Sequence, residues 1–285
     1  MILKSYAKIN LTLKVIGKLA NNYHLLDSLI SYINLFDVIE IVENKLGKHH
    51  IIGNSDIILA DNLILKVMLK FQHYYNITKP KFFTIKHQKN IPIGAGLGGG
   101  SSNAAVILNY LYSYYNIDES LDKKINFAKD LGADIPFFLT NHSKYISGIG
   151  EILGNNCNFP NLPVLLVKPV MPLATQDVFS VFKRDIDEKI EYEHDSEFND
   201  INSFFEYILL LGNDLIAVSQ QLCPDIKKIL KVSNYGIDYI ASMSGSGSTC
   251  FFLFKTEEDC ALMKQKLIRI FPNFFIYNTI LLNQC

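Results

Sequence analysis

The stretch IPIGAGLGGGSSNAA at residues 91–105 constrains the fold of this chain more than any other segment. It gathers five glycines and two serines and runs directly into NAAVILNYLYSYYN, residues 103–116, which is predicted to be a helix. Ser101, Ser102 and Asn103 are favoured N-cap residues, so we expect the glycines to lead into a helix N-terminus. Unpaired N–H groups and the helix dipole attract anions there, and glycines let a phosphate approach the backbone closely. The segment therefore predicts a phosphate-binding loop rather than a flexible linker.

Two other glycine motifs fit this segment poorly. Gly94, Gly96 and Gly99 have the G-x-G-x-x-G spacing of dinucleotide-binding folds, which needs a strand directly before the glycines and another after the helix. Here HQKNIP, residues 87–92, separates the preceding strand from the first glycine, and a second predicted helix follows the first. The Walker A motif needs a lysine after its last glycine, and none follows. A nicotinamide-dependent oxidoreductase is therefore a less favoured alternative.

The composition indicates a globular chain with balanced charge. Of the 285 residues 49% are hydrophobic and 19% charged, and 27 basic residues against 28 acidic ones give a net charge of -1. This balance disfavours nucleic-acid binding through a basic face, and no apolar run approaches the ~20 residues that span a bilayer. The lysines of MILKSYAKINLTLK and five scattered cysteines predict a cytoplasmic protein with reduced thiols. The histidines show no zinc-ligand spacing, so the sequence predicts no metal site made by the protein alone.

Strand and helix patterns in both halves of the chain predict an α+β fold of two domains. Apolar and polar residues alternate over residues 8–15, which predicts a half-buried strand with Lys8 and Asn10 on its polar face. The domains are expected to meet near residue 155, giving residues 1–155 and 156–285. Further elements are expected as strands at 36–43, 81–87, 161–169 and after Asn273, and as helices at 61–76 (capped by Asp61), 120–132, 200–218, 223–236 and 257–271.

A second glycine-rich turn, SGSGST at residues 244–249, joins two predicted strands within residues 237–254. Alone it would be an ordinary hairpin turn. Together with the first loop it is a candidate second clamp on a phosphorylated substrate.

Together these segments resemble the motifs of the GHMP kinase superfamily, which is named for galactokinase, homoserine kinase, mevalonate kinase and phosphomevalonate kinase. AKINLTLKVIGK (7–18) resembles its N-terminal motif, IPIGAGLGGGSSNAA its phosphate loop, and MSGSGSTCFFLF (243–254) its C-terminal motif. The resemblance is closer still to the family of kinases that act on 4-(cytidine 5'-diphospho)-2-C-methyl-D-erythritol. Its marks occur in the family's order as YHLLDS (23–28), DNLI (61–64), GADIPFFL (132–139) and GIGEIL (148–153).

This resemblance implies a fold and an activity. Each of two domains would be a mostly antiparallel sheet layered with helices, with the active site in the cleft between the domains. The enzyme would transfer the γ-phosphate of ATP, with Mg²⁺ expected, to the 2-hydroxyl of the cytidine-diphosphate substrate in the non-mevalonate isoprenoid pathway. Its partners would be small molecules and neither nucleic acid nor a membrane, and the sequence makes no prediction of oligomeric state.

The resemblance assigns the chemistry to two residues. Asp134 in GADIPFF matches the family's catalytic carboxylate, and Lys8 in AKINLTL matches its catalytic lysine. A carboxylate can accept the proton of the attacking hydroxyl, and a nearby ammonium can orient that carboxylate and polarise the hydroxyl. Without the family, Asp134 would be an ordinary cap before Pro136, and Lys8 a solvated strand residue.

The other site residues that the resemblance implies are divided between two ligands. Tyr23 would stack on the cytosine while His24 contacts the base edge, and Ser101, Ser102 or Asp134 could help to hold Mg²⁺. The residues expected at ATP are Asn62, Lys89, Pro92, Ile93, Gly94, Ala95, Gly96, Leu97, Gly98, Gly99, Gly100, Ser101 and Ser102. The residues expected at the cytidine-diphosphate substrate are Asn10, Tyr23, His24, Thr175 and Phe179.

The chain departs from the family pattern at two places. GKLANNYH (17–24) stands where the family has G-K-R-x-D-G-Y-H, so that Asn22 replaces a glycine, and asparagine is the next best residue at positive φ. Gln176 stands where proline is usual after Thr175. The alternatives that remain open are a mevalonate- or homoserine-type kinase, the related diphosphomevalonate decarboxylase, and a non-catalytic nucleotide- or RNA-binding module.

Overall fold

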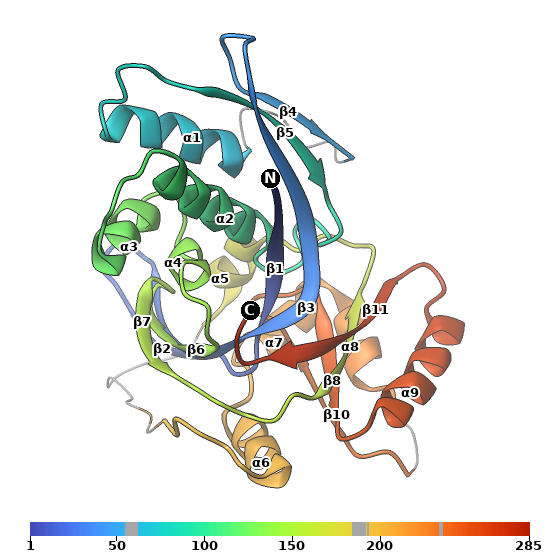
Figure 1. Cartoon of the computed structure of the whole chain (residues 1–285). Coiled ribbons are helices and arrows are strands. Elements are labelled where there is room, and N and C mark those ends of the chain that lie inside the picture. Colours follow the sequence, from blue (N-terminus) through green and yellow to red (C-terminus); the bar gives the residue numbers. More distant parts are fainter. Residues whose placement is uncertain (55–61, 184–191, 193, 234–235) are drawn as a thin grey trace. The chain divides into compact units, whose positions relative to one another are not determined.

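The computed structural model describes residues 1–54, 62–183, 192, 194–233 and 236–285, which form two compact units (Figure 1). Unit 1 consists of Met1–Ala7, Leu35–Ile93 and Gly98–Asn141, and unit 2 of Lys8–Asn34, Gly94–Leu97 and His142–Cys285. Strands β1 (Ile2–Asn10) and β3 (His24–Asn44) each pass from one unit to the other, so the units alternate along the chain. The single boundary near residue 155 stays a proposal.

Unit 1 combines a sheet with a layer of helices. Strand β5 (Phe82–Gln88) pairs antiparallel with β3, from Val38 opposite Gln88 to Asn44 opposite Phe82, and parallel with β4 (His50–Gly53). The helices of this unit are α1 (Leu63–Tyr74), α2 (Gly99–Tyr114), α3 (Leu121–Lys129) and the short α4 (Ile135–Phe138).

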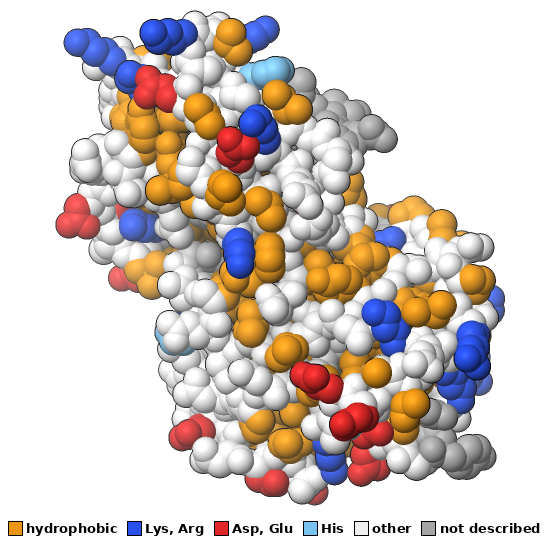
Figure 2. Space-filling view, turned by 45° about the vertical axis from the view of Figure 1, so that its right-hand side comes forward, with side chains coloured by type: hydrophobic (Ala, Val, Ile, Leu, Met, Phe, Trp, Pro, Cys, Tyr) orange, Lys and Arg blue, Asp and Glu red, His pale blue; other side chains and the backbone are white. Residues whose placement is uncertain are grey.

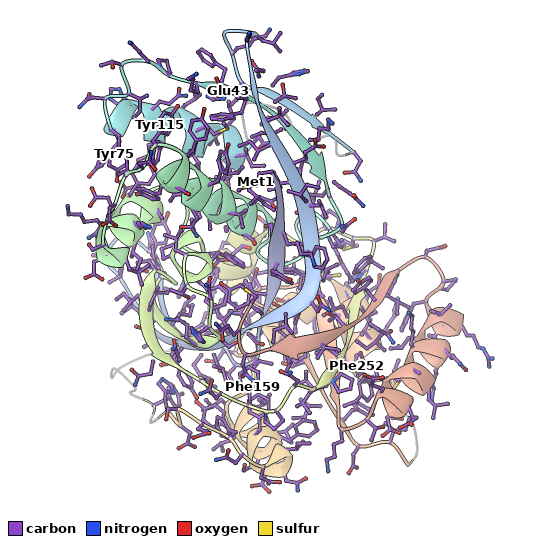
Figure 3. All side chains as sticks on the ribbon, viewed as in Figure 1. Met1, Glu43, Tyr75, Tyr115, Phe159 and Phe252 are labelled. Atoms are coloured by element: carbon purple, nitrogen blue, oxygen red, sulfur yellow. The ribbon has the colours of Figure 1, made fainter. Side chains whose placement is uncertain are left out.

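The core of unit 1 follows from the two side-chain periods of its elements. Ile39 and Ile41 of β3 point into the core, whereas Val42 is 48% exposed, because successive strand residues face opposite sides of a sheet. Phe71 of α1 is fully buried, and its ring centroid lies 4.7 Å from that of Tyr75 and 5.9 Å from that of Tyr115. Figure 3 labels these two tyrosines. These aromatic contacts join the ends of α1 and α2.

Unit 2 is built on an antiparallel sheet in the order β11–β8–β10–β9. The first part of β3 pairs with β2 and β6, and β6 also pairs with β7. The strands of this unit are β2 (Lys14–Lys18), β6 (Lys144–Gly148), β7 (Ile152–Asn156), β8 (Pro163–Lys168), β9 (Tyr239–Met243), β10 (Cys250–Phe254) and β11 (Phe275–Leu282). Its helices are α5 (Thr175–Val181), α6 (Ile201–Leu211), α7 (Ile216–Leu222), α8 (Pro224–Leu230) and α9 (Glu257–Ile270).

The hydrophobic core of unit 2 contains residues of its N-terminal segment as well as of its C-terminal segment. Leu13 and Val15 are buried together with Leu165 of β8 and Phe252 of β10 (Figure 3 labels Phe252). Residues 8–34 are therefore part of the hydrophobic core that the C-terminal half of the chain builds.

Several predicted elements are confirmed and others need correction. The strands at 81–87 and after Asn273 and the helix at 257–271 are present as β5, β11 and α9. The expected helix at 200–218 is two helices, because Gly212 has φ +59 and ends α6. Asp61 lies outside the described residues, and the side chain of Asn62 caps α1 by accepting from the N–H of Ile64.

The opening strand also differs from the prediction. β1 ends at Asn10 and β2 begins at Lys14, so the alternating segment is interrupted. Its polar face is not half-solvated, since Lys8 is 5% and Asn10 4% exposed.

Candidate active site

The glycine run has a backbone that only glycine adopts easily. Gly94, Gly96 and Gly98 have φ values of +62, +71 and +67, which are in the left-handed region. Gly98 is the N-cap of α2 and provides no side chain to accept from the first N–H groups of the helix. Those N–H groups therefore remain for another acceptor, as the loop prediction requires.

The predicted N-cap role of Ser101, Ser102 and Asn103 is wrong, because the helix begins earlier. Gly99 and Gly100 already form its first turn, which places the serines within the helix. The Ser102 hydroxyl accepts a hydrogen bond from Ser5 Oγ at 2.7 Å, so it ties α2 to β1 within unit 1.

The second glycine turn packs against the first within unit 2. Ser244 Oγ donates to the carbonyl of Gly96 at 2.9 Å and accepts from the N–H of Asn10 at 3.1 Å. A Cβ added to Gly96 would lie 2.7 Å from the Ser244 carbonyl oxygen and 2.8 Å from that of Gly247. Residues 244–249 are all buried, and this turn supports the first loop; its role as a second clamp on the substrate stays a prediction.

Lys8 and Asn10 are adjacent on the same face of β1, as the sequence predicts. Lys8 Nζ donates to Asn10 Oδ1 at 2.6 Å, and Asn10 Nδ2 donates to Ser28 Oγ at 2.8 Å. A Cβ on Gly245 would lie 3.3 Å from Asn10 Oδ1 and 4.0 Å from Lys8 Nζ, so the second glycine turn covers this pair. That cover explains why both side chains are buried.

Asp134 precedes α4 in unit 1. It occupies the N-cap position, but its side chain makes no cap hydrogen bond and its backbone is in the right-handed helical region. The alternative of an ordinary helix cap is therefore wrong. The side chain is half-buried, and α4 itself is buried from Ile135 to Phe138, so the backbone that carries the carboxylate is held firmly.

Lys89 and the start of α2 lie close together in unit 1. A Cβ on Gly99 would be 2.9 Å from Lys89 Nζ, and that ammonium forms an ion pair with Asp37 at 2.6 Å. The sequence analysis missed Asp37. Its signal was its parity with the buried Ile39 and Ile41 in the strand FDVIEIVE, which places a carboxylate on the core face.

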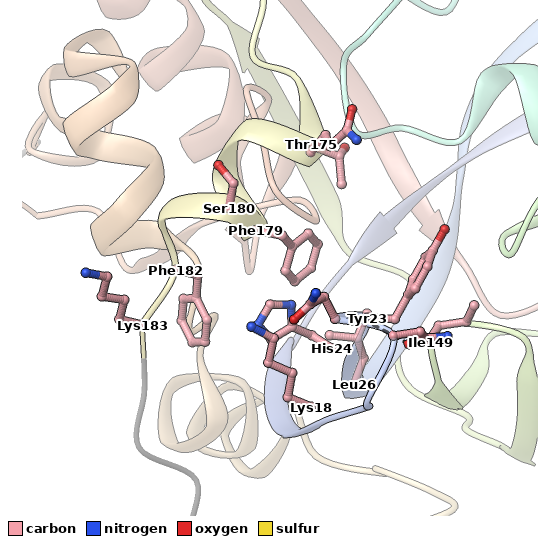
Figure 4. A pocket seen from close by; sticks show the side chains of 13 residues that line it. Lys18, Tyr23, His24, Leu26, Ile149, Thr175, Phe179, Ser180, Phe182 and Lys183 are labelled. Atoms are coloured by element: carbon pink, nitrogen blue, oxygen red, sulfur yellow. Dashed lines mark hydrogen bonds between the residues drawn. The ribbon is translucent and has the colours of Figure 1, made fainter.

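Four of the five residues predicted at the substrate line one pocket of about 840 Å³ in unit 2 (Figure 4). The His24 ring stacks on Phe179 with centroids 5.1 Å apart and an interplanar angle of 23°. Tyr23 is 58% exposed and Thr175 Oγ1 lies 2.8 Å from Ser246 Oγ. Asn10 is not among the lining residues.

The electrostatics of this pocket favour an uncharged histidine and an anionic ligand. Burial, and then the charge of Lys18, lower the pKa of His24. Lys18 and Lys183 line the pocket, and no aspartate or glutamate does so among the described residues. The sequence analysis missed Phe182, whose ring meets His24 edge-on at 5.7 Å, and Lys183, which follows it in the chain.

The turn before Tyr23 adopts the conformation expected for a glycine replacement. Asn22 has φ +69, and the Asn21 side chain accepts a hydrogen bond from the N–H of Tyr23 at 3.2 Å. Asn22 thus adopts the positive φ, and Asn21 provides a side-chain acceptor within the turn.

The described residues show neither a metal cluster nor a membrane-spanning helix. Among the described residues, no group of three His, Cys, Asp or Glu side chains is arranged to hold a metal ion. No helix in the described part of the chain has the length and apolar character needed to cross a membrane.

Comparisons with known proteins cover both halves of the chain. The GHMP kinases N terminal domain matches residues 62–142, and the GHMP kinases C terminal domain matches residues 190–273. The 4-diphosphocytidyl-2-C-methyl-D-erythritol kinase of Prochlorococcus marinus (strain MIT 9515) is 36% identical over 269 residues, covering 88% of this chain and 85% of that protein. The kinase of the same name from Thermoanaerobacter sp. (strain X514) is 33% identical over 276 residues, covering 95% and 90%.

Solved structures agree with the sequence relatives. A crystal structure of 4-(cytidine 5'-diphospho)-2C-methyl-D-erythritol kinase aligns with a TM-score of 0.75 at 25% identity, covering 98% of this chain and 99% of that one. A mevalonate kinase structure aligns at 0.65 with 16% identity over the full length of both chains, which shows a shared fold. The predicted α+β fold is confirmed. The chain belongs to the 4-diphosphocytidyl-2-C-methyl-D-erythritol kinase family of the GHMP kinases.

Proposed function

We propose that this chain transfers the γ-phosphoryl group of ATP to the 2-hydroxyl of 4-(cytidine 5'-diphospho)-2-C-methyl-D-erythritol and releases ADP. The observation that carries the proposal is the gathering of Tyr23, His24, Thr175 and Phe179 around one pocket. An aromatic-lined pocket with two lysines suits a cytosine base attached to a diphosphate. Mevalonate and homoserine carry no base, so the pocket favours this acceptor over theirs.

The glycine run supports the nucleotide part of the proposal. ATP phosphates would approach the first turn of α2, where Gly98 leaves N–H groups without a side-chain cap. The residues that we propose at ATP are those of the loop from Pro92 to Ser102, with Asn62 and Lys89. Gly94 gives this loop room, since no atom lies within 4 Å of a Cβ placed there.

The proposed phosphoryl transfer uses Asp134 and Lys8. The substrate hydroxyl oxygen forms a bond to the γ-phosphorus while the bond from that phosphorus to the β,γ-bridging oxygen breaks. The hydroxyl proton passes to the Asp134 carboxylate, and ADP leaves with the bridging oxygen. Lys8, oriented by its hydrogen bond to Asn10, supplies positive charge to the reacting hydroxyl.

Mg²⁺ fits this scheme as a companion of ATP. Magnesium in kinases is bound mainly by phosphate oxygens and water with one or two protein oxygens, so it does not need a cluster of three ligands in the protein. Ser101 is the protein oxygen donor that we propose, because Ser102 Oγ already pairs with Ser5 and the Asp134 carboxylate is proposed to accept the hydroxyl proton. When bound, the ion neutralises charge on the transferring phosphates.

We also propose that the protein acts in the cytoplasm on small molecules. All five cysteines are free thiols in the structure, and a reducing compartment keeps thiols in that state. The absence of a nucleic-acid partner remains a prediction from the balanced charge.

The test is an ADP-release assay with three acceptors in parallel. We expect release to depend on 4-(cytidine 5'-diphospho)-2-C-methyl-D-erythritol and not on mevalonate or homoserine. Release that depends on mevalonate or homoserine instead would replace the proposed substrate. ATP·Mg and CDP should also raise the melting temperature while NAD leaves it unchanged, since only a ligand of the folded state stabilises it.

The role of Asp134 is tested by Asp134→Asn. We expect kcat to fall by roughly 10²–10⁴-fold, the usual contribution of a general base, with KM for both substrates changed little. Asp130→Asn is the matched control, because Asp130 is an exposed aspartate close in sequence that pairs with Lys70. Equal kcat values for Asp134→Asn and wild type would remove Asp134 from the catalytic pair.

A further inference from the structure

A fully buried carboxylate lies behind the glycine run in unit 1. Asp37 of β3 has no exposed surface. Its Oδ1 accepts from the N–H groups of Asn90 and Ile91, both at 2.8 Å. Its Oδ2 accepts from Lys89 Nζ at 2.6 Å and from Asn103 Nδ2 at 3.0 Å. One side chain therefore binds three consecutive residues before the loop and one residue of α2 after it.

The position of Lys89 gives this arrangement an electrostatic role in addition to packing. Its side chain is only 8% exposed, and its ammonium lies against Gly99 in the first turn of α2. A cation at the positive end of a helix is electrostatically unfavourable unless a negative group compensates it. Asp37 is that group, because its Oδ2 lies 2.6 Å from Lys89 Nζ. His87, whose Nε2 lies 3.4 Å from the same oxygen, is the other titratable side chain that faces Asp37, and an imidazole supplies no negative charge.

The backbone of Lys89 is held by hydrogen bonds that do not involve Asp37. The N–H of Lys89 donates to Asn54 Oδ1 at 2.7 Å, and Asn54 Nδ2 donates to the Lys89 carbonyl at 3.3 Å. The backbone of Lys89 is thus anchored without Asp37. Within Lys89, therefore, Asp37 fixes the ammonium and not the backbone, whereas its bonds to the N–H groups of Asn90 and Ile91 hold the backbone that follows.

We infer that Asp37 is a positioning residue for the nucleotide, holding the Lys89 ammonium at the first turn of α2 where ATP phosphates are proposed to bind. This inference rests on the proposed function only in placing ATP at that loop. It makes no use of the acceptor pocket. In this arrangement Asp37 itself touches no ligand and acts through Lys89.

The test measures nucleotide binding without catalysis. Isothermal titration of AMP-PNP·Mg and, separately, of CDP is performed on wild type, Asp37→Asn, Lys89→Met and the double variant. We expect Asp37→Asn to bind AMP-PNP roughly tenfold more weakly, within the range of couplings between contacting residues, with CDP affinity unchanged. In the Lys89→Met background the Asp37→Asn change should have less than about a twofold effect, because its action passes through that lysine.

Several results would overturn the inference. Unchanged or tighter AMP-PNP binding by Asp37→Asn would show that the carboxylate does not hold Lys89 for the phosphates. Additive effects in the double variant would show that Asp37 acts through another route, and an equal loss of CDP affinity would indicate general loss of structure. Should Asp37→Asn fail to fold, Lys89→Met carries the same prediction of weaker AMP-PNP binding.

A control variant shows whether the effect is specific to Asp37, and the wild type alone shows whether the proposed function fails. Glu40→Gln removes an exposed carboxylate of the same strand, which pairs with Lys86 at 3.0 Å, and should leave AMP-PNP binding unchanged. If the wild type binds AMP-PNP but phosphorylates no cytidine-diphosphate acceptor, the proposed function fails while the Asp37 comparison remains valid.

Discussion

A carboxylate without contact to water keeps its charge only when protein hydrogen bonds replace its hydration. For Asp37, burial raises the pKa, but the hydrogen bond from His87, the charge of Lys89 and the N–H of Ile91 lower it to about 2. Burial lowers the pKa of Lys89, and the Asp37 charge opposes that shift. The carboxylate is therefore ionised throughout the range in which the enzyme would work.

This depressed pKa predicts a defined loss of stability in acid. The folded-state pKa lies below the ordinary value of 3.8, so the contribution is complete above about pH 5 and is lost as the pH falls through about 2. The difference corresponds to about 2 kcal/mol. Urea unfolding of wild type and Asp37→Asn at pH 5, 4, 3 and 2 checks this. We expect the gap in unfolding free energy between them to narrow by that amount, and a constant gap would contradict it.

The sequence predicted the conformation or orientation of single residues correctly where neighbouring residues in the chain determine it. Asn22 has the positive φ expected from its place in the turn, and Lys8 and Asn10 share a face as strand period requires. Asp37 was missed because its partners lie more than 50 residues away in the sequence at Lys89 and Asn103. Only the fold brings these groups together, although strand parity already placed Asp37 on the core face.

At the level of elements, the two glycine turns act as one assembly in unit 2. The prediction of two glycine loops needed only their sequences. That one packs on the other, through Ser244 and Gly96, depends on long-range contacts that no local pattern encodes.

Two glycines in the first loop offer a matched test of this packing. Alanine at Gly94 meets only backbone strain, at φ +62 with no atom within 4 Å of its Cβ. Alanine at Gly96 meets similar strain at φ +71 and also collides with the carbonyl oxygens of Ser244 and Gly247. We expect Gly94→Ala to lower the unfolding free energy by roughly 1–2 kcal/mol and Gly96→Ala by roughly 3–5 kcal/mol.

Denaturant unfolding of both variants measures this difference. Equal destabilisation would mean that the second turn moves away from Gly96 without cost, and that it does not support the first loop.

The break between α6 and α7 explains why the sequence predicted a single long helix over residues 200–218. Asn213 Nδ2 donates to the carbonyls of Met243 at 2.7 Å and Gly245 at 2.9 Å, and its Oδ1 accepts from the N–H of Leu215. The apolar residues continue at helical spacing across this point, so periodicity alone does not reveal the break. Gly212 and a side chain that bonds the second glycine turn end the helix instead.

For the whole molecule, attraction of anionic substrates has to arise locally. The net charge is -1, and acidic and basic side chains are interspersed on the face shown in Figure 2. An overall positive field is therefore absent, and steering by net charge is not available. The helix N-terminus at Gly98 in the glycine run, and Lys18 and Lys183 in the pocket, provide the local positive potential instead.

Because the two units alternate along the chain, we can predict which fragments of it fold on their own. All of unit 1 lies within residues 1–155, whereas unit 2 needs residues 8–34 in addition to its C-terminal part. Leu13 and Val15 belong to the core of unit 2, and Lys14 pairs with Asp214 at 2.5 Å. Residues 156–285 alone would therefore lack core side chains and strand partners.

We expect the fragment 156–285 to show no cooperative unfolding transition, because the exposed core exceeds what a marginally stable domain tolerates. A chain that joins residues 8–34 through a flexible glycine-serine linker to residues 142–285 should regain one, since it restores Leu13, Val15 and the pairing of β3 with β6. Near-ultraviolet circular dichroism during thermal unfolding measures both. A cooperative transition in 156–285 alone would instead establish the boundary near residue 155 and make residues 8–34 dispensable for folding. Failure of the joined chain, with 156–285 also unfolded, would show that unit 2 needs its remaining segment Gly94–Leu97 or residues of unit 1 as well.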